Sequence, residues 1–217
     1  MKLYYINNEQ TLLLIDSHHI VLDGTSLQIL INEFCNMYND ELIQTSKIDY
    51  KDYCIWESNF NNSNEYKKLE ENWKKEFNNL EIPVINMPYD FPISQKRSND
   101  GNILHSTISS ETFKQIELLS KKYNVTPYVF CLTAFYVFLY RYTGQNNIIV
   151  GSPISGRFSK DLENIIGMFV NNIPLNLEIH SNNTFEELLK QVQEKVLFAM
   201  QNQPYPYNDL MKLLKIN

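Results

Sequence analysis

The sequence predicts an α/β fold in two lobes of mixed helices and strands. Apolar runs of strand length alternate along the chain with apolar residues at the three- and four-residue spacing of a helix. Residues 81–101 hold three prolines, at intervals that forbid a regular helix or a central strand. With 217 residues, the chain can form one large domain or two small ones. We therefore expect a first lobe over residues 1–80, a connector over 81–101 and a second lobe over 102–217.

In the first lobe, the pattern predicts a strand pair, or one strand and its turn, followed by two helices. Residues 11–16 form an apolar run that we expect to be a buried strand. The first helix should begin with Thr25 or Ser26 as its cap and end near Asn39. A second helix is expected over residues 64–78, where large apolar side chains recur at helical spacing among charged residues.

In the second lobe, strands alternate with helices. The dipeptide Thr126-Pro127 is a strong helix start, and Thr184 with Glu187 forms a capping box. The helix that starts at Thr126 is apolar on nearly every side, so it should be central to this lobe. The expected strands cover residues 102–109, 148–154 and a segment ending at Ile179, and the expected helices cover 111–123, 126–142, 161–166 and the stretch behind Thr184.

Composition and charge argue against several classes of partner. The net charge of −6 gives no electrostatic reason to expect nucleic acid or an anionic membrane surface. The longest apolar run, residues 127–140, is too short to span a bilayer, and the first residues lack the apolar region of a signal peptide. Cys35, Cys54 and Cys131 are an odd count without a CxxC pair, so we expect reduced, mostly buried thiols in a cytoplasmic protein.

The chemistry is expected in the loop that follows the apolar run, at His18, His19, Asp23 and Gly24. Histidine can move a proton near neutral pH. Because side chains alternate in an extended segment, one ring should face a cleft and the other the packed interior. Asp23 could orient an imidazole or pair with a distant cation, and Gly24 permits a turn or a close approach. Taken singly, such histidines are usually structural and an Asp-Gly pair is usually a turn.

No metal site is expected. His18, His19, Asp23 and His105 are the available ligands, but neighbouring histidines rarely chelate one ion, and no third ligand has suitable spacing. The sequence also holds no GxSxG motif, P-loop or dinucleotide fingerprint.

In combination these residues are more specific, because residues 18–24 match HHxxxDG. This is the signature of the condensation domains of nonribosomal peptide synthetases, which belong with the chloramphenicol-acetyltransferase-like acyltransferases. The other segments resembling family motifs, in the same order, are residues 50–56 (YxDYxxW), 142–157 (YTGQ…VVGxPxxGR), 166–172 (IGxFVNT) and 202–207 (NQxYPF). The resemblance covers residues 12–210 and implies a two-lobed chloramphenicol-acetyltransferase-like α/β sandwich.

The resemblance also implies roles for single residues. The family's second histidine, here His19, faces a tunnel between the lobes and acts as a general base or positions the attacking amine. Its aspartate, here Asp23, is held by an arginine from the other lobe. Arg157 is the candidate, since it too follows a buried strand and a glycine, and an aspartate at a strand end needs compensation. His18 and Gly24 would support the site.

Residues 167–172 resemble the family's loop that crosses between the lobes beneath the site. Gly167, Phe169 and Asn171 are therefore candidates for lining the substrate channel. The family's domains bind no metal or cofactor themselves. Their substrates arrive on the 4'-phosphopantetheine of donor and acceptor peptidyl carrier proteins, which are the implied partners.

Two family motifs, SxAQxR and RHExLR, are absent, and the chain stops soon after its YPF-like segment. We therefore expect a partial domain, truncated at both ends, that works with adjacent synthetase domains or a missing N-terminal segment. The first hypothesis is peptide-bond formation between carrier-tethered acyl groups, of the type that joins an L-configured donor to an L-configured acceptor (LCL). The alternatives are an epimerisation domain, for which no glutamate base stands at a convincing position, and a non-catalytic fragment that only binds a carrier or a partner half.

Overall fold

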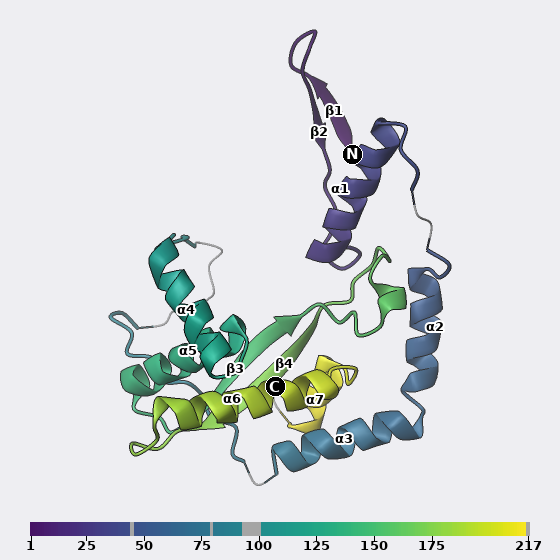
Figure 1. Cartoon of the computed structure of the whole chain (residues 1–217). Coiled ribbons are helices and arrows are strands. Elements are labelled where there is room, and N and C mark those ends of the chain that lie inside the picture. Colours follow the sequence, from purple (N-terminus) through teal and green to yellow (C-terminus); the bar gives the residue numbers. More distant parts are fainter. Residues whose placement is uncertain (44–45, 79, 93–100, 216–217) are drawn as a thin grey trace.

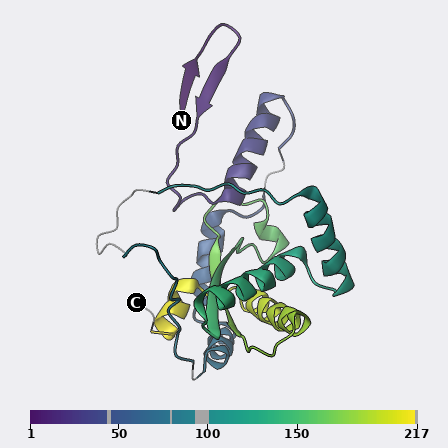
Figure 2. The ribbon, with the colours of Figure 1, turned by 90° about the vertical axis from the view of Figure 1, so that its left-hand side faces the viewer.

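The computed structural model describes residues 1–43, 46–78, 80–92 and 101–215. Within these ranges, the chain forms helices and two separate antiparallel sheets of two strands each. The first hairpin and the first helix project away from the remaining elements in both views (Figures 1 and 2). No helix in the described ranges is both long and apolar enough to cross a membrane.

The chain begins with a hairpin of β1 (Lys2–Tyr5) and β2 (Thr11–Leu14), followed by α1 (Gly24–Tyr38). The register pairs Lys2 with Leu14. The predicted strand pair and helix are therefore confirmed, but the prediction of a buried strand is wrong. The side chains of Leu12 and Leu14 are exposed, because the two strands pair only with each other and no described helix packs closely on either face.

Two helices follow, α2 (Tyr50–Phe60) and α3 (Asn64–Glu76). The sequence predicted only α3. The start of α2 is set by Asp49 and Asp52, which form a capping box in which each side chain accepts a hydrogen bond from the other residue's backbone N–H. An aspartate at the third position replaces the usual glutamate, which is why the box was missed.

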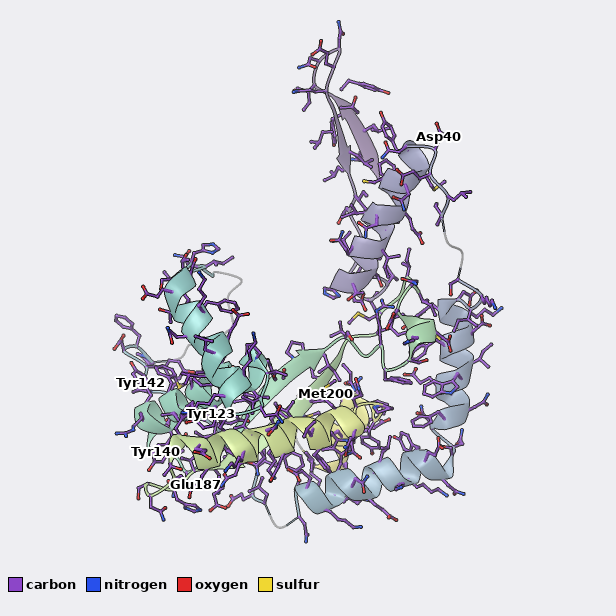
Figure 3. The ribbon with its side chains drawn as sticks, in the orientation of Figure 1. Asp40, Tyr123, Tyr140, Tyr142, Glu187 and Met200 are labelled. Carbon is purple, nitrogen blue, oxygen red and sulfur yellow. The ribbon has the colours of Figure 1, made fainter. Side chains whose placement is uncertain are left out.

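The second part of the chain matches most of its predicted elements. They are α4 (Ser110–Lys122), α5 (Pro127–Thr143), β3 (Asn147–Ile154), the 3₁₀ turn η1 (Lys160–Leu162), β4 (Asn171–Glu178), α6 (Phe185–Gln201) and α7 (Tyr207–Leu213). Thr126 caps α5, and Thr184 forms a capping box with Glu187, as predicted. Glu187 lies in the first turn of α6, where Figure 3 labels it.

Two elements predicted in this part are wrong. Residues 102–109 form no strand, because they find no partner strand among the described residues and a strand needs a ladder of hydrogen bonds. The helix expected over 161–166 is only the single 3₁₀ turn η1, since the next residues turn away to reach α1.

The core lies where α5 and α6 pack on the hairpin of β3 and β4. Five residues of α5 are buried there, so its central position is confirmed: Val129, Leu132, Thr133, Tyr136 and Leu139. Trp73 and Phe77, at the end of α3, are buried in the same core. Helix α3 thus packs on elements of the second part of the chain, and the boundary of the lobes over residues 81–101 stays a prediction. The segment 93–100 lies outside the described residues.

The expectation of buried cysteines is wrong, because Cys35, Cys54 and Cys131 are all exposed. Cys131 lies on an apolar face of α5. That face, however, is the outer one, where Phe135 and Phe138 also remain about half exposed, and no described element covers it.

Candidate functional site

The site is organised around an ion pair between the buried side chains of Asp23 and Arg157, which lie 134 positions apart in the chain. The Arg157 Nη2 atom donates to the two carboxylate oxygens of Asp23 at 3.2 and 3.4 Å. The exposed fractions of the two side chains are only 1% for Asp23 and 4% for Arg157. The predicted pairing of these residues is therefore confirmed.

Arg157 is held from several sides. Its Nη1 atom donates to the carbonyl oxygens of Leu162 and Ile165 at 2.6 and 2.7 Å, so it also fixes the turn around η1. The guanidinium carbon lies 4.2 Å from the centre of the Phe169 ring, a cation–π contact. Only the Nε atom of this buried side chain has no hydrogen-bond partner. These contacts give the guanidinium one well-defined position.

Asp23 caps helix α1, which the sequence had assigned to Thr25 or Ser26. Its Oδ1 atom accepts from the backbone N–H of Ser26 at 2.7 Å, and its Oδ2 atom accepts from the backbone N–H of Phe169 at 3.0 Å. One carboxylate therefore satisfies the first turn of α1 and a backbone group of the distant loop. The side chain that fixes the loop's end also docks α1 on the second part of the chain.

Ser26 is the residue of the site that sequence reasoning missed. Its side chain is fully buried, and its hydroxyl donates to the carbonyl oxygen of Gly167 at 2.7 Å. The same hydroxyl oxygen accepts from the backbone N–H of Gly167 at 2.9 Å and from Arg157 Nη2 at 2.8 Å. A small hydroxyl residue three positions after the aspartate was the only available signal, and it suggested a local cap instead.

Gly167 is a contact point between segments. Its backbone bonds to Ser26, and an added Cβ atom would clash with the Tyr50 ring. The hydroxyl of Tyr50 donates to the carbonyl oxygen of Met168 at 2.8 Å. A residue larger than glycine would push this ring aside and break that bond. Gly167 is thus needed for the close approach of α2, and it does not line the cavity described below.

Gly24 does not have the role expected from the sequence. It is the first residue of α1, its φ angle lies outside the left-handed region, and a Cβ atom there would meet nothing within 4 Å. The tight glycine of the site is instead Gly156, which has φ +68° and whose added Cβ atom would clash with the carbonyl oxygen of Phe169.

Both histidines of the motif are exposed, so the expectation that one faces the packed interior is wrong. Residues 19–21 form a turn, in which side chains do not alternate as they do in an extended strand. The Nδ1 atom of His18 accepts from the backbone N–H of Ile20 at 3.1 Å, which fixes the turn. The His19 imidazole makes no hydrogen bond to another described residue and is free to contact a ligand.

A cavity of about 260 Å³ lies beside Phe169. Phe169 and Asn171, two of the three channel candidates, line it, and the assignment of a substrate channel here stays a prediction. The Asn171 side chain is already engaged, because its amide nitrogen donates to the carbonyl oxygens of Gln203 and Tyr205 and its oxygen accepts from the backbone N–H of Tyr207. Asn171 therefore fixes the cavity wall and has little capacity left to bind a substrate.

Opposing effects act on the pKa of Asp23. Burial raises it, while hydrogen bonds from Ser26 and the Phe169 backbone and the charge of Arg157 lower it, and the net result is a pKa below the usual value. A carboxylate whose folded-state pKa is depressed stabilises the fold above its unfolded pKa, about 3.9, and this stabilisation is lost as the pH falls through the folded-state value.

We therefore expect the docking of α1 to weaken on acidification below about pH 4. Hydrogen exchange measures that docking, through the protection of the Gly167 and Phe169 amides. The exchange rates are corrected for the intrinsic rate at each pH. An Asp23→Asn variant should dock more weakly at neutral pH and lose less on acidification. Equal pH dependence of the two proteins would contradict the assignment to Asp23.

No group of three histidine, cysteine or carboxylate side chains is close enough to hold a metal ion within the part of the chain that the structure describes. The residues gathered at the site offer instead one buried ion pair, backbone groups and two exposed imidazoles.

The fold and this site define a class of protein. The solved condensation domain of the monacolin K polyketide synthase MokA superposes with a TM-score of 0.78 at 24% identity over 92% of this chain, which shows a shared chloramphenicol-acetyltransferase-like fold. The chain belongs to the condensation-domain family, whose model matches residues 1–217. It is 38% identical to bacitracin synthase 2 of Bacillus licheniformis over 99% of this chain, and 36% identical to bacitracin synthase 1 of the same organism over 97%.

These relatives are much longer than the chain. The matched part is 8% of bacitracin synthase 2 and 4% of bacitracin synthase 1, which are nonribosomal peptide synthetases. Of the solved MokA condensation domain, the chain covers 47%. The comparisons thus show the family of this chain. The activity of the larger proteins is taken up for this chain under the proposed function below.

Proposed function

We propose that this chain takes part in peptide-bond formation during nonribosomal peptide synthesis. It would act on aminoacyl or peptidyl groups held as thioesters on the 4'-phosphopantetheine of donor and acceptor carrier proteins. The observation that carries the proposal is the clamp of Asp23, Ser26 and Arg157, which fixes the end of the HHxxxDG loop on the second part of the chain and leaves His19 accessible.

In the proposed reaction, the α-amine of the acceptor attacks the donor thioester carbon. A carbon–nitrogen bond forms and the carbon–sulfur bond breaks. The amine loses one proton, and the released thiolate takes up one proton to become a thiol. His19 would accept or steer that amine proton, a role that an exposed imidazole can fill. His18, engaged with Ile20, would hold the turn that presents His19.

For the stereochemical type we propose the joining of an L-configured donor to an L-configured acceptor. Its support is the pattern of residues 18–24 with the Thr-Ser-Leu-Gln-Ile-Leu segment that follows. The configuration of the product decides between this type and the others.

The test mixes the chain with two carrier proteins, one loaded with a donor acyl group and one with an acceptor aminoacyl group. Because the solved MokA domain is about twice as long as the matched part, the assay is run with and without the segment that precedes the matched region in bacitracin synthase 1. A dipeptidyl thioester detected by mass spectrometry supports the proposal. A D-aminoacyl thioester without a dipeptide would show epimerisation, and carrier binding without any product would show a non-catalytic binding role.

A further inference from the structure

Hydrogen bonds hold several walls of the cavity beside Phe169 in place. Four segments meet there: helix α2, the segment that follows β3, the loop that leads into β4, and the turn between α6 and α7. The hydrogen bonds of Asn171 hold the last two together, and the bond from the Phe169 N–H to Asp23 anchors the loop. Its volume of about 260 Å³ lies close to the lower end of the range for small-molecule sites.

Glu57 is the only charged residue among those that line this cavity in the described part of the chain. Its side chain is half-buried, and its Oε1 atom accepts a hydrogen bond from the Tyr53 hydroxyl at 3.2 Å. Burial and the nearby Glu57 carboxylate raise the pKa of Tyr53, so the hydroxyl keeps its proton and remains a donor. Tyr53 therefore holds the carboxylate in one orientation at the cavity wall.

The charge of Glu57 is not balanced within the described structure. No lysine, arginine or histidine nitrogen of the described residues lies within 4.0 Å of its carboxylate. Burying part of a carboxylate without a cation costs free energy that a bound cation would return. The guanidinium of Arg157 packs on the Phe169 ring but does not line the cavity, and its hydrogen bonds go to Asp23 and the turn around η1.

We propose that this cavity binds an ammonium group of the substrate, with Glu57 as the anionic recognition residue and Tyr53 as its positioning residue. The ammonium group belongs either to the α-amine of an aminoacyl substrate or to a basic side chain. An N⁺–H···O⁻ hydrogen bond in a partly desolvated site is among the stronger polar contacts, and it would select cationic over neutral substrates. This proposal extends the proposed function by naming a substrate class, and binding alone tests it.

The test titrates the chain with three amides and follows the backbone amide resonances of Asn172 and Tyr207 by nuclear magnetic resonance. Glycinamide offers only an α-amine, N-acetyl-lysine methylamide offers only a side-chain amine, and N-acetyl-norleucine methylamide offers neither. We expect at least one of the two cationic probes to bind and the norleucine probe to bind at least about tenfold more weakly. Which cationic probe binds identifies the source of the ammonium group.

Glu57→Gln removes the charge with little change of size, and it should weaken binding of the cationic probe by about tenfold or more. Glu163→Gln, an exposed change of the same charge outside the cavity, is the matched control and should bind as the unmodified chain does. Three outcomes would overturn the proposal. The Glu57 variant binds the cationic probe as tightly as the unmodified chain does, the norleucine probe binds as tightly as a cationic probe, or neither cationic probe binds. None of these outcomes depends on peptide-bond formation. Failure of the binding proposal can therefore be told apart from failure of the proposed condensation activity.

Discussion

Replacing His19 with alanine is expected to lower the rate of dipeptide formation by about 10²–10⁴-fold, the usual contribution of a positioned acid–base group. The imidazole is exposed and makes no hydrogen bond to another described residue, so its removal leaves the fold intact. The free energy of unfolding should change by no more than about 0.5 kcal/mol, as for other surface substitutions. Initial rates of product formation measure the effect, with the carriers and the preceding segment present.

His105→Ala is the matched control, because His105 is exposed, lies outside the site and belongs to a segment without regular structure. It should leave the rate unchanged. A rate that survives in the His19 variant would remove the proposed role. The pH dependence of the rate adds a second readout. If His19 is a general base, the rate falls as the imidazole is protonated. If His19 only positions the amine through a neutral contact, the rate does not follow that protonation.

Replacing Arg157 with methionine is expected to be the most destabilising change, at about 3–5 kcal/mol. The variant leaves the buried Asp23 carboxylate without its cation, and the carbonyl groups of Leu162 and Ile165 lose their donor. Helix α1 should then separate from the second part of the chain. Hydrogen exchange at Gly167 and Phe169, together with urea unfolding, measures the loss.

The control is Arg141→Met, an exposed arginine in the last turn of α5 that takes part in no ion pair among the described residues. It should shift stability by no more than about 0.5 kcal/mol. The double variant Asp23→Asn with Arg157→Met should cost less than the sum of the two single changes, because no unpaired charge remains buried. A fully additive double variant would show that the two side chains do not act as a pair.

Sequence reasoning worked best where the signal is local. Capping residues and helical spacing predicted α1, α3, α4, α5 and α6 with small errors at their ends, because each helix start needs a side chain for its unpaired N–H groups. The same reasoning missed α2 and invented a strand over residues 102–109. A strand depends on a partner that no local pattern reveals.

The candidate site was predicted in part. The match of residues 18–24 to HHxxxDG pointed to His19 and Asp23, and a cation after a buried strand pointed to Arg157. Ser26 and Tyr50 could not be predicted, since their hydroxyl groups bond to backbone atoms of residues 167 and 168, far along the chain. Nothing in the order of residues distinguishes such a hydroxyl from an ordinary cap or packing residue.

The amino-acid order by itself determined the family, most of the helices and the residues that carry reactive groups. The tertiary structure decided which of those groups are buried. It made Asp23 the cap of α1 and the partner of Arg157, left the cysteines and β2 exposed, and placed Glu57 as the charge in the wall of a cavity. The physical reason is that local spacing shows which face of an element is apolar, whereas burial depends on which distant segment covers that face.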